Sequence, residues 1–183
     1  MILSRSVATW GNTVAAVLKD CDIPAHVESN TGYFSSYEIQ VILSMLRILD
    51  NPLQDIPMAA VLASPIVGMD DEELAQIRSA FKGVSFAQAA LSAMAGEDGY
   101  EDEKLKAFAL VFERLRGAVA DTPIHELLYM MLDETGFYRY ASAMPAGKRR
   151  RQNIDMLIEM AAAYEKTSYK GLFHFVRYID IQQ

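Results

Sequence analysis

The sequence has little cysteine: Cys21 is the single thiol among its 183 residues. One thiol cannot form an internal disulfide, and no second cysteine or suitably spaced histidine accompanies it to bind zinc. This fits a reducing compartment, so we expect a cytoplasmic protein. The chain also lacks an apolar run of about 18 residues, which a membrane-spanning helix requires. Arg5 falls where a signal peptide would carry its apolar core, so we expect neither membrane contact nor export.

The residue patterns of an active site are absent as well. No G-x-x-x-x-G-K-[ST] loop is present to hold a triphosphate. The three histidines, His26, His125 and His174, are far apart and have neither metal-binding nor catalytic-triad spacing. The acidic run Asp70 to Glu73 offers oxygen ligands for a cation, but capping of a helix start explains it better. We therefore expect no catalytic residue, no metal and no cofactor in this chain.

Charge is unevenly distributed along the sequence. The net charge is −7, which argues against a strong autonomous nucleic-acid binder. Residues 1–136 carry a net −11, whereas residues 137–183 carry a net +4. The densest basic cluster is Lys148-Arg149-Arg150-Arg151, whose side chains cannot form one stripe because consecutive helical residues differ by about 100°. Some of the four are expected to contact DNA phosphates and others to turn inward and form ion pairs.

Apolar periodicity predicts a mainly α fold, an orthogonal helical bundle with a small β-containing N-terminal segment. Ile2-Leu3 and Ala25 to Glu28 are predicted strands on either side of a helix from Thr9 to Leu18. After a turn at Gly32, a helix capped by Ser35 or Ser36 ends at Asn51-Pro52. Further helices are predicted over Met58 to Leu62, Glu72 to Phe81, Phe86 to Met94, Glu103 to Val119, Pro123 to Thr135, Arg149 to Lys166 and Leu172 to Ile181.

Several short motifs follow one another in a particular order: Gly32-Tyr33-Phe34, Glu38-Ile39, Asp50-Asn51-Pro52, Gln54-Asp55-Ile56-Pro57, Ser64-Pro65-Ile66-Val67-Gly68, and Arg150 with Asn153-Ile154. Together they resemble the helicase-nuclease A-subunit of AddAB and RexAB recombination complexes, which is related to the UvrD, PcrA and RecB helicases of superfamily 1. The resemblance implies that residues 1–31 are a remnant of a RecA-like motor domain, with a strand-helix-strand order. It implies that residues 32–183 are a helical accessory subdomain of the 2B type.

The same resemblance implies a parent protein that is an ATP-dependent DNA helicase and exonuclease in double-strand-break repair and recombination. Such a parent uses ATP and Mg²⁺, but this fragment lacks the corresponding motifs and is expected to be inactive alone. The implied partners are duplex or junction DNA, bound weakly, the remaining helicase domains and the B-subunit of the complex. The alternative is a protein-interaction module that contacts this nuclease partner without touching DNA.

Two candidate DNA-binding regions follow. The loop containing Ser64, Gly68 and Met69 resembles the helicases' glycine hairpin, which presents backbone N–H groups to phosphates; a plain interhelical turn is the alternative. In the basic cluster, Arg150 matches a family arginine and is expected to be structural, which leaves Lys148, Arg149 and Arg151 for phosphate contacts. The aromatic residues Tyr33, Phe34, Phe137, Tyr138 and Tyr140 are expected to fill the core rather than to stack on bases.

Overall fold

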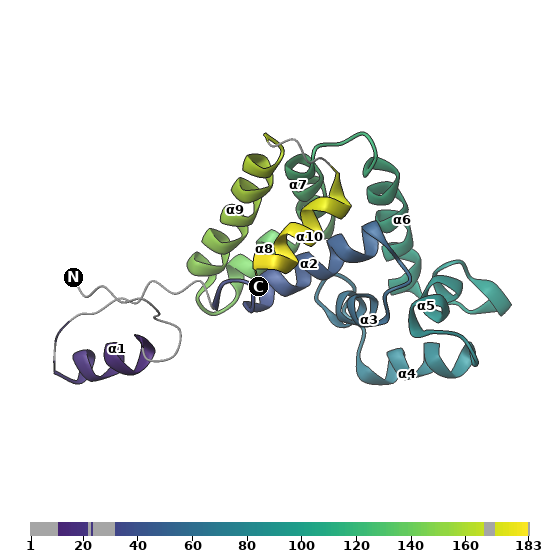
Figure 1. Ribbon diagram of the computed structural model, residues 1–183. Coiled ribbons are helices and arrows are strands. Elements are labelled where there is room, and N and C mark those ends of the chain that lie inside the picture. The colour runs from purple at the N-terminus through teal and green to yellow at the C-terminus, as the bar shows by residue number, and fades with distance from the viewer. Residues whose placement is uncertain (1–10, 22, 24–31, 167–170, 183) are drawn as a thin grey trace.

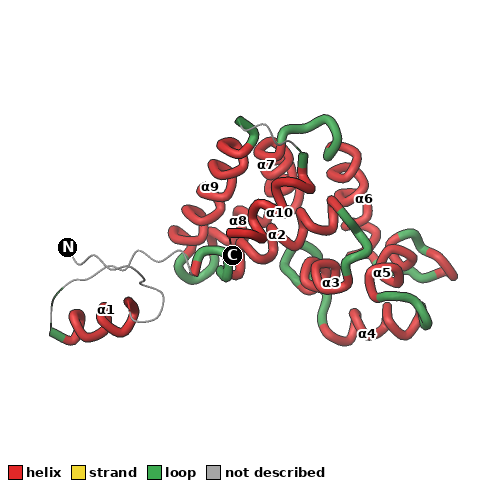
Figure 2. Tube along the Cα trace, viewed as in Figure 1, coloured by secondary structure: helices red, strands yellow, loops and turns green. Residues whose placement is uncertain are grey.

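The computed structural model describes residues 11–21, 23, 32–166 and 171–182. Within these ranges the chain consists of helices joined by loops and contains no strand, which confirms the predicted mainly α fold (Figure 2). The predicted strands at Ile2-Leu3 and Ala25 to Glu28 lie outside the described residues. Among the helices that are described, none is long and apolar enough to cross a membrane.

The helices follow one another along the chain with short connections, and their bounds agree closely with the apolar periodicity. They are α1 (Gly11–Asp20), α2 (Tyr37–Asp50), α3 (Asp55–Ala63), α4 (Asp71–Ala80), α5 (Phe86–Met94), the short 3-10 helix η2 (Glu97–Gly99), α6 (Glu103–Ala118), α7 (Ile124–Thr135), α8 (Phe137–Ala143), α9 (Gly147–Tyr164) and α10 (Leu172–Gln182).

Helix α2 is the centre of the bundle. It contacts α3, α6, α9 and α10, so it joins the group formed by α3, α4 and α5 to the group formed by α7, α8 and α9 (Figure 1). Its side chains are buried on nearly every side, as expected of a helix that is apolar around most of its circumference. The fully buried residues include Ile39, Ile42, Met45, Leu46 and Ile48. Every core residue in the described part of the chain comes from position 39 or later.

The helix ends have identifiable causes. Asn51 ends α2 immediately before a proline, as predicted. Helix α3 begins at Asp55, three residues before the predicted start, because Pro57 lies in the first turn, where its missing N–H costs no hydrogen bond. Asp70 caps α4 and forms a reciprocal capping box with Glu73, as expected for that acidic run.

The connection between α7 and α9 holds a helix that periodicity did not predict. Gly136 adopts a left-handed conformation with φ of 64° that ends α7, and the short helix α8 begins directly after it. A second left-handed residue, Ala146, with φ of 59°, precedes α9. At the next position, a Cβ on Gly147 would lie 1.9 Å from the carbonyl oxygen of Ser142. Only glycine therefore allows the end of α8 to approach the start of α9 this closely.

Candidate nucleic-acid interface

The basic cluster lies in the first turns of α9, and the structure separates its four members. Lys148, Arg149 and Arg151 are exposed to solvent. Arg150 instead turns inward, where its guanidinium donates to the carboxylate of Glu38 and, through Nε, to the carbonyl oxygen of Pro145 at 3.1 Å. The predicted division between a structural Arg150 and three exposed cations is thus the arrangement observed. DNA contact by those three side chains stays a prediction.

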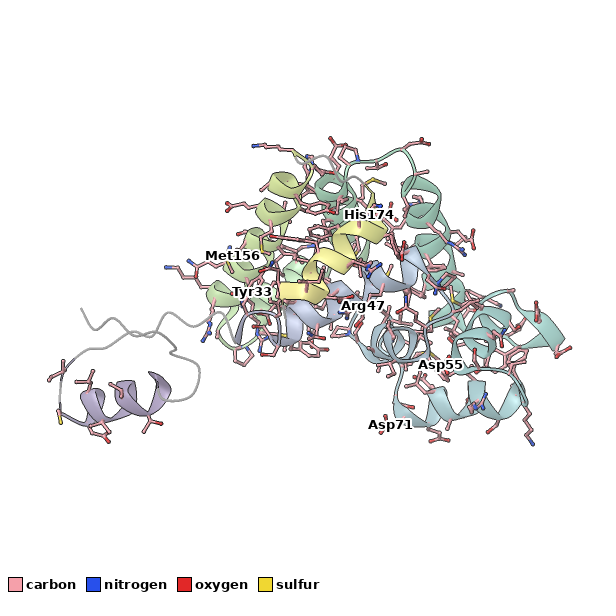
Figure 3. The ribbon with its side chains drawn as sticks, in the orientation of Figure 1. Tyr33, Arg47, Asp55, Asp71, Met156 and His174 are labelled. Atoms are coloured by element: carbon pink, nitrogen blue, oxygen red, sulfur yellow. The ribbon has the colours of Figure 1, made fainter. Side chains whose placement is uncertain are left out.

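Glu38 organises the contacts between α2 and α9. Its side chain is 2% exposed, and besides Arg150 it accepts a hydrogen bond from Asn153 Nδ2 at 2.6 Å. The hydroxyl of Tyr33 donates to the backbone carbonyl of Asn153 at 2.9 Å. Burial is the main cause that raises the pKa of Tyr33, with the negative charge of Glu38 second. The phenol therefore stays neutral and acts as a donor that anchors the approach to α2 against α9 (Figure 3).

The start of α9 is electrostatically unfavourable for the helix itself. Its first turn holds no acidic residue, and Ala146 provides no side-chain cap. Cations at a helix N-terminus oppose the positive end of the macrodipole. The three exposed basic side chains therefore add to a local positive potential that the helix does not neutralise, and an external polyanion would be attracted there.

The second candidate region, the loop from Ser64 to Met69 between α3 and α4, has a different character. Ser64 and Met69 are 3% and 4% exposed, so neither side chain is available to a large ligand. The N–H groups of residues 66–70 all donate within the protein, to the hydroxyl and carbonyl of Ser64, the carbonyl of Leu62 and the carboxylate of Glu73. The N–H groups of this loop thus have internal acceptors, and contact of Ser64, Gly68 and Met69 with DNA stays a prediction. Gly68, with φ of 75°, shapes an interhelical turn, which was the alternative interpretation.

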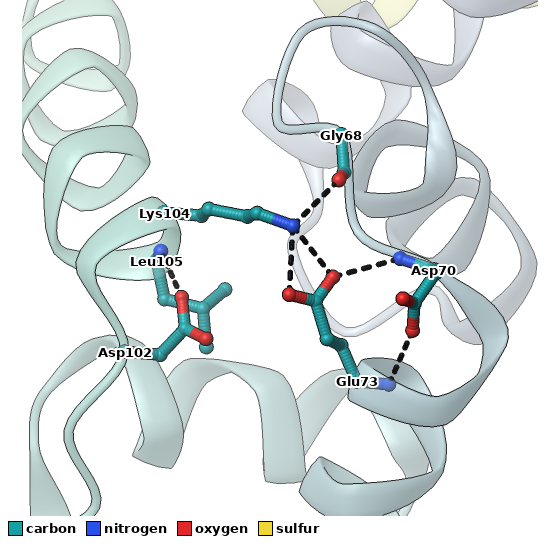
Figure 4. Close-up of polar contacts among 6 residues, drawn as sticks. All are labelled: Gly68, Asp70, Glu73, Asp102, Lys104 and Leu105. Carbon is teal, nitrogen blue, oxygen red and sulfur yellow. Dashed lines mark hydrogen bonds and ion pairs between the residues drawn. The ribbon is translucent and has the colours of Figure 1, made fainter.

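Charges beside this loop also disfavour an anion. Lys104 Nζ donates to the carbonyl oxygen of Gly68 at 2.9 Å and to both carboxylate oxygens of Glu73 at 2.7 Å (Figure 4). The hydrogen bond from Lys104, followed by one from the backbone N–H of Asp70, lowers the pKa of Glu73. The nearest cation is thus already neutralised, and Asp70 and Asp71 remain on the surface. Figure 1 shows the α3–α4 loop at the end of the bundle away from α9, so the structure does not bring the two candidate regions together.

The aromatic residues divide between core and surface. Phe137 is buried, and Tyr33, Phe34 and Tyr138 are partly buried against the core, as the core-filling interpretation requires. Tyr140 does not follow that expectation, since it is 45% exposed. Among the histidines, His125 contacts the carboxylate of Glu165. His26 lies outside the described residues, and within the described part no cluster of metal-ligating side chains occurs.

Sequence reasoning missed two contributors to the α9 region. Glu38 was named only as part of the Glu38-Ile39 motif, although a charged residue beside the apolar Ile39 in a strongly apolar helix was a signal of a buried ion pair. Tyr37, the first residue of α2, was not considered, and it is 44% exposed beside Arg149 and Arg150. Its exposure depends on the way α2 meets α9, which local sequence does not encode.

Comparison with known proteins gives a consistent assignment. No protein-family model matches the chain. The chain is 41% identical over 182 residues to a protein of Anoxybacillus flavithermus, and 38% identical over 182 residues to one of Oceanobacillus iheyensis. A protein of Bacillus cytotoxicus is 40% identical over 184 residues. All three are named as the A-subunit of an ATP-dependent helicase/nuclease, and each match covers 98% of this chain and 15% of the relative.

Proposed function

Because the chain is a homologue of one segment of the ATP-dependent helicase/nuclease A-subunit, we propose that it serves as an accessory DNA-binding subdomain of an ATP-dependent DNA helicase and exonuclease. The parent activity would act in double-strand-break repair and recombination. The chain spans about 15% of the length of the curated relatives it matches, so ATP and Mg²⁺ would be bound by other parts of such a parent. The role left to this segment is to guide DNA and to contact the neighbouring helicase domains and the partner B-subunit.

The DNA-binding part of the proposal is carried by one observation: the side chains of the basic cluster have two different roles. One arginine, Arg150, holds the fold together through Glu38, while Lys148, Arg149 and Arg151 project from the same turns into solvent. Exposed Lys and Arg side chains bind the phosphate backbone by releasing counterions, without regard to sequence. Three such contacts on a protein of net charge −7 predict weak, salt-sensitive binding.

The proposed domain division also has support. A boundary at residue 31 separates a motor-domain remnant from the helical subdomain. In the described residues, core side chains occur only from Ile39 onwards, and the polar contacts of Tyr33 and Ser36 connect the start of the proposed subdomain to the bundle. Among the side chains that the structure describes, the shared core is formed by residues of the helices α2 to α10.

An alternative function has its own observation. Large apolar side chains stand exposed on several helices: Ile181 is 80%, Ile56 83% and Leu110 71% exposed. Apolar side chains left in water favour contact with another protein surface. A module that contacts the partner nuclease, without direct DNA contact, would use such residues.

The test is fluorescence anisotropy with a labelled duplex that carries a single-stranded tail, titrated with the 183-residue chain at low salt. Replacing Lys148, Arg149 and Arg151 by Glu is expected to abolish binding. The wild-type slope of log affinity against log salt is expected to correspond to about three phosphate contacts or fewer. The matched control replaces three exposed basic residues elsewhere, Lys82, Arg116 and Lys166, by Glu, and it keeps most of the affinity despite the same change in net charge.

Two outcomes contradict the proposal. Equal binding by the wild type and the Lys148, Arg149 and Arg151 variant would show that the basic cluster is not the DNA surface, and the loop around Gly68 would need to be reconsidered. Absence of wild-type binding even at low salt would favour the protein-interaction module.

A further inference from the structure

A cavity of about 350 Å³ lies at the far end of α9 from the basic cluster. Three parts of the chain form it: the α6–α7 loop with the first turn of α7, the residue that follows α9, and the start of α10. Figure 1 shows these parts together at the upper end of the bundle, whereas the basic start of α9 lies at the lower end. Helix α9 has 18 residues, so its length of about 27 Å separates the cavity from the candidate DNA-binding residues.

The cavity combines apolar walls with a partly buried carboxylate. Ile124, Leu127 and Leu172 belong to its lining and are buried core residues. The carboxylate comes from Glu165, whose side chain is 20% exposed. Binding pockets in proteins are mostly apolar, contain a few fixed polar groups and have volumes of about 300–1,000 Å³. The cavity therefore has the composition of a binding pocket and a volume at the small end of that range.

The start of α7 holds the Glu165 carboxylate in place. One oxygen accepts from the backbone N–H of Ile124, and the other contacts Nδ1 of His125. Because carboxylate oxygens only accept, Nδ1 of His125 carries the proton in this contact. Pro123 at the N-cap of α7 makes no side-chain capping bond, so Glu165 supplies an acceptor that this helix end needs. An ionised carboxylate has about four acceptor sites, and Glu165 is therefore able to accept from a further donor.

The charge of the lining favours a cation. Asp121 is a second carboxylate in the lining, and it is exposed. Among the lining residues that the structure describes, none is lysine or arginine. A guanidinium group is flat, more weakly hydrated than an ammonium group and rich in N–H donors, so arginine enters an apolar cavity more readily than lysine does. Its flat group also stacks on rings, and the imidazole of His125 is one in this lining.

We propose that this cavity binds an arginine side chain presented by a partner protein, whose guanidinium donates to Glu165 and whose aliphatic stem packs against Val119 and Leu172. The volume of about 350 Å³ equals that of roughly twelve water molecules at ~30 Å³ each, enough for one extended side chain. Arginine side chains that fill pockets are frequent anchors of protein–protein contacts. The inference does not depend on the proposed DNA binding. Because the cavity and the basic cluster lie at opposite ends of α9, both are available at once.

The experiment is an NMR titration of the isotope-labelled 183-residue chain with N-acetyl-arginine N-methylamide, which presents the side chain as a peptide does. Saturable shifts are expected at the backbone amides of residues 119–127, 165 and 171–172, with a dissociation constant on the order of 1 mM or tighter. The citrulline analogue has nearly the same shape without the charge, and it is expected to bind about tenfold more weakly or worse. The lysine analogue is also expected to bind more weakly than the arginine probe.

Three variants locate the site. Glu165→Gln removes the charge but keeps an acceptor for the N–H of Ile124, and it is expected to weaken binding of the arginine probe about tenfold or more. Thermal melting checks that this variant is folded. Ala120→Phe leaves Glu165 untouched: Ala120 is an exposed residue of the lining, so the larger side chain fills the cavity and binding is expected to be lost. Asp133→Asn removes an exposed carboxylate from α7 outside the lining, and this matched control keeps the wild-type affinity.

Several results would overturn this inference. Without saturable shifts from the arginine probe, the cavity is not a binding site for arginine. Equal affinity for the arginine and citrulline probes would show that the charge of Glu165 plays no part, and equal affinity for the lysine probe would contradict the choice of arginine. Unchanged binding by the folded Ala120→Phe variant would place the probe elsewhere on the surface. Each of these results leaves the anisotropy measurements with DNA unaffected, so this inference and the proposed function fail independently.

Discussion

Arg150 in the first turns of α9 donates a hydrogen bond to the carboxylate of Glu38 in the first turn of α2, 112 positions earlier in the chain. The carboxylate is 2% exposed, and the arginine side chain is 23% exposed. The pair therefore joins α2 to α9 in a largely buried contact. The neighbours of Arg150 in the sequence remain on the surface. The same turns of helix thus supply both a structural contact and the candidate DNA-binding cations.

Removing one member of this pair should destabilise the chain far more than removing both. Arg150→Met leaves the buried Glu38 carboxylate without its cation, and we expect a loss of about 3 kcal/mol in the free energy of unfolding. Combining it with Glu38→Met removes the buried charge, so much of that loss should be recovered. Urea denaturation of the two single variants and the double variant measures the coupling. Strictly additive effects would show that the two side chains do not depend on each other.

The close approach of α8 and α9 predicts opposite effects for two glycine substitutions. Gly147→Ala places a Cβ 1.9 Å from the Ser142 carbonyl oxygen, so the backbone must shift, and we expect a loss of at least about 1–3 kcal/mol. Gly117→Ala is the control: Gly117 lies within α6 with open space around it. There alanine should stabilise the helix by up to about 1 kcal/mol. Thermal melting of both variants decides the matter, and a neutral Gly147→Ala would mean that α8 and α9 are not held this closely.

Much of this fold followed from sequence because helix boundaries are local. Apolar spacing and caps located α5 at Phe86 to Met94, and Asn51-Pro52 ended α2 where predicted. Helix α8 was missed because seven residues give too few turns for a periodic signal. The strand predictions at Ile2-Leu3 and Ala25 to Glu28 fall outside the described residues and stay predictions.

The candidate site could be predicted only in part. A run of four basic residues was visible, and helical geometry required them to diverge. Which residue Arg150 contacts depends on how α2 packs against α9, and that is a long-range property. For the loop at Gly68, the sequence motif resembled a phosphate-binding hairpin, but it did not show where the loop's N–H groups donate. Ser64 and Glu73 provide most of their acceptors, within the protein.

The contact between Glu73 and Lys104 predicts a pH-dependent contribution to stability. The pKa of the Glu73 carboxyl is lowered in the folded chain from its ordinary value of 4.5. Its contribution is therefore fully present above pH 4.5 and is lost as the pH falls below that value. Glu73→Gln should lower the melting temperature at pH 7, and the difference from the wild type should shrink progressively on acidification below pH 4.5.

Glu113→Gln is the control for this measurement. Glu113 is exposed in the middle of α6, away from the first turn, and within the described residues its side chain makes no hydrogen bond or ion pair. Its replacement should change the melting temperature little. If the Glu73→Gln difference stayed constant between neutral pH and about pH 3, the ion pair with Lys104 would not be its cause.

The basic start of α9 predicts that DNA binding and stability are opposed. Lys148 and Arg149 lie in a first turn that has no acidic residue and no side-chain cap, where cations oppose the helix macrodipole. Replacing them with Glu, together with Arg151, should raise the free energy of unfolding by about 1 kcal/mol while DNA binding is lost. If these three residues had a purely structural role, the same replacement would lower the free energy of unfolding. Urea denaturation and anisotropy on one preparation therefore measure stability and DNA binding of the same triple variant. If the variant is more stable and no longer binds DNA, the basic cluster is a functional surface. If the variant unfolds more readily, the three side chains have a structural role instead.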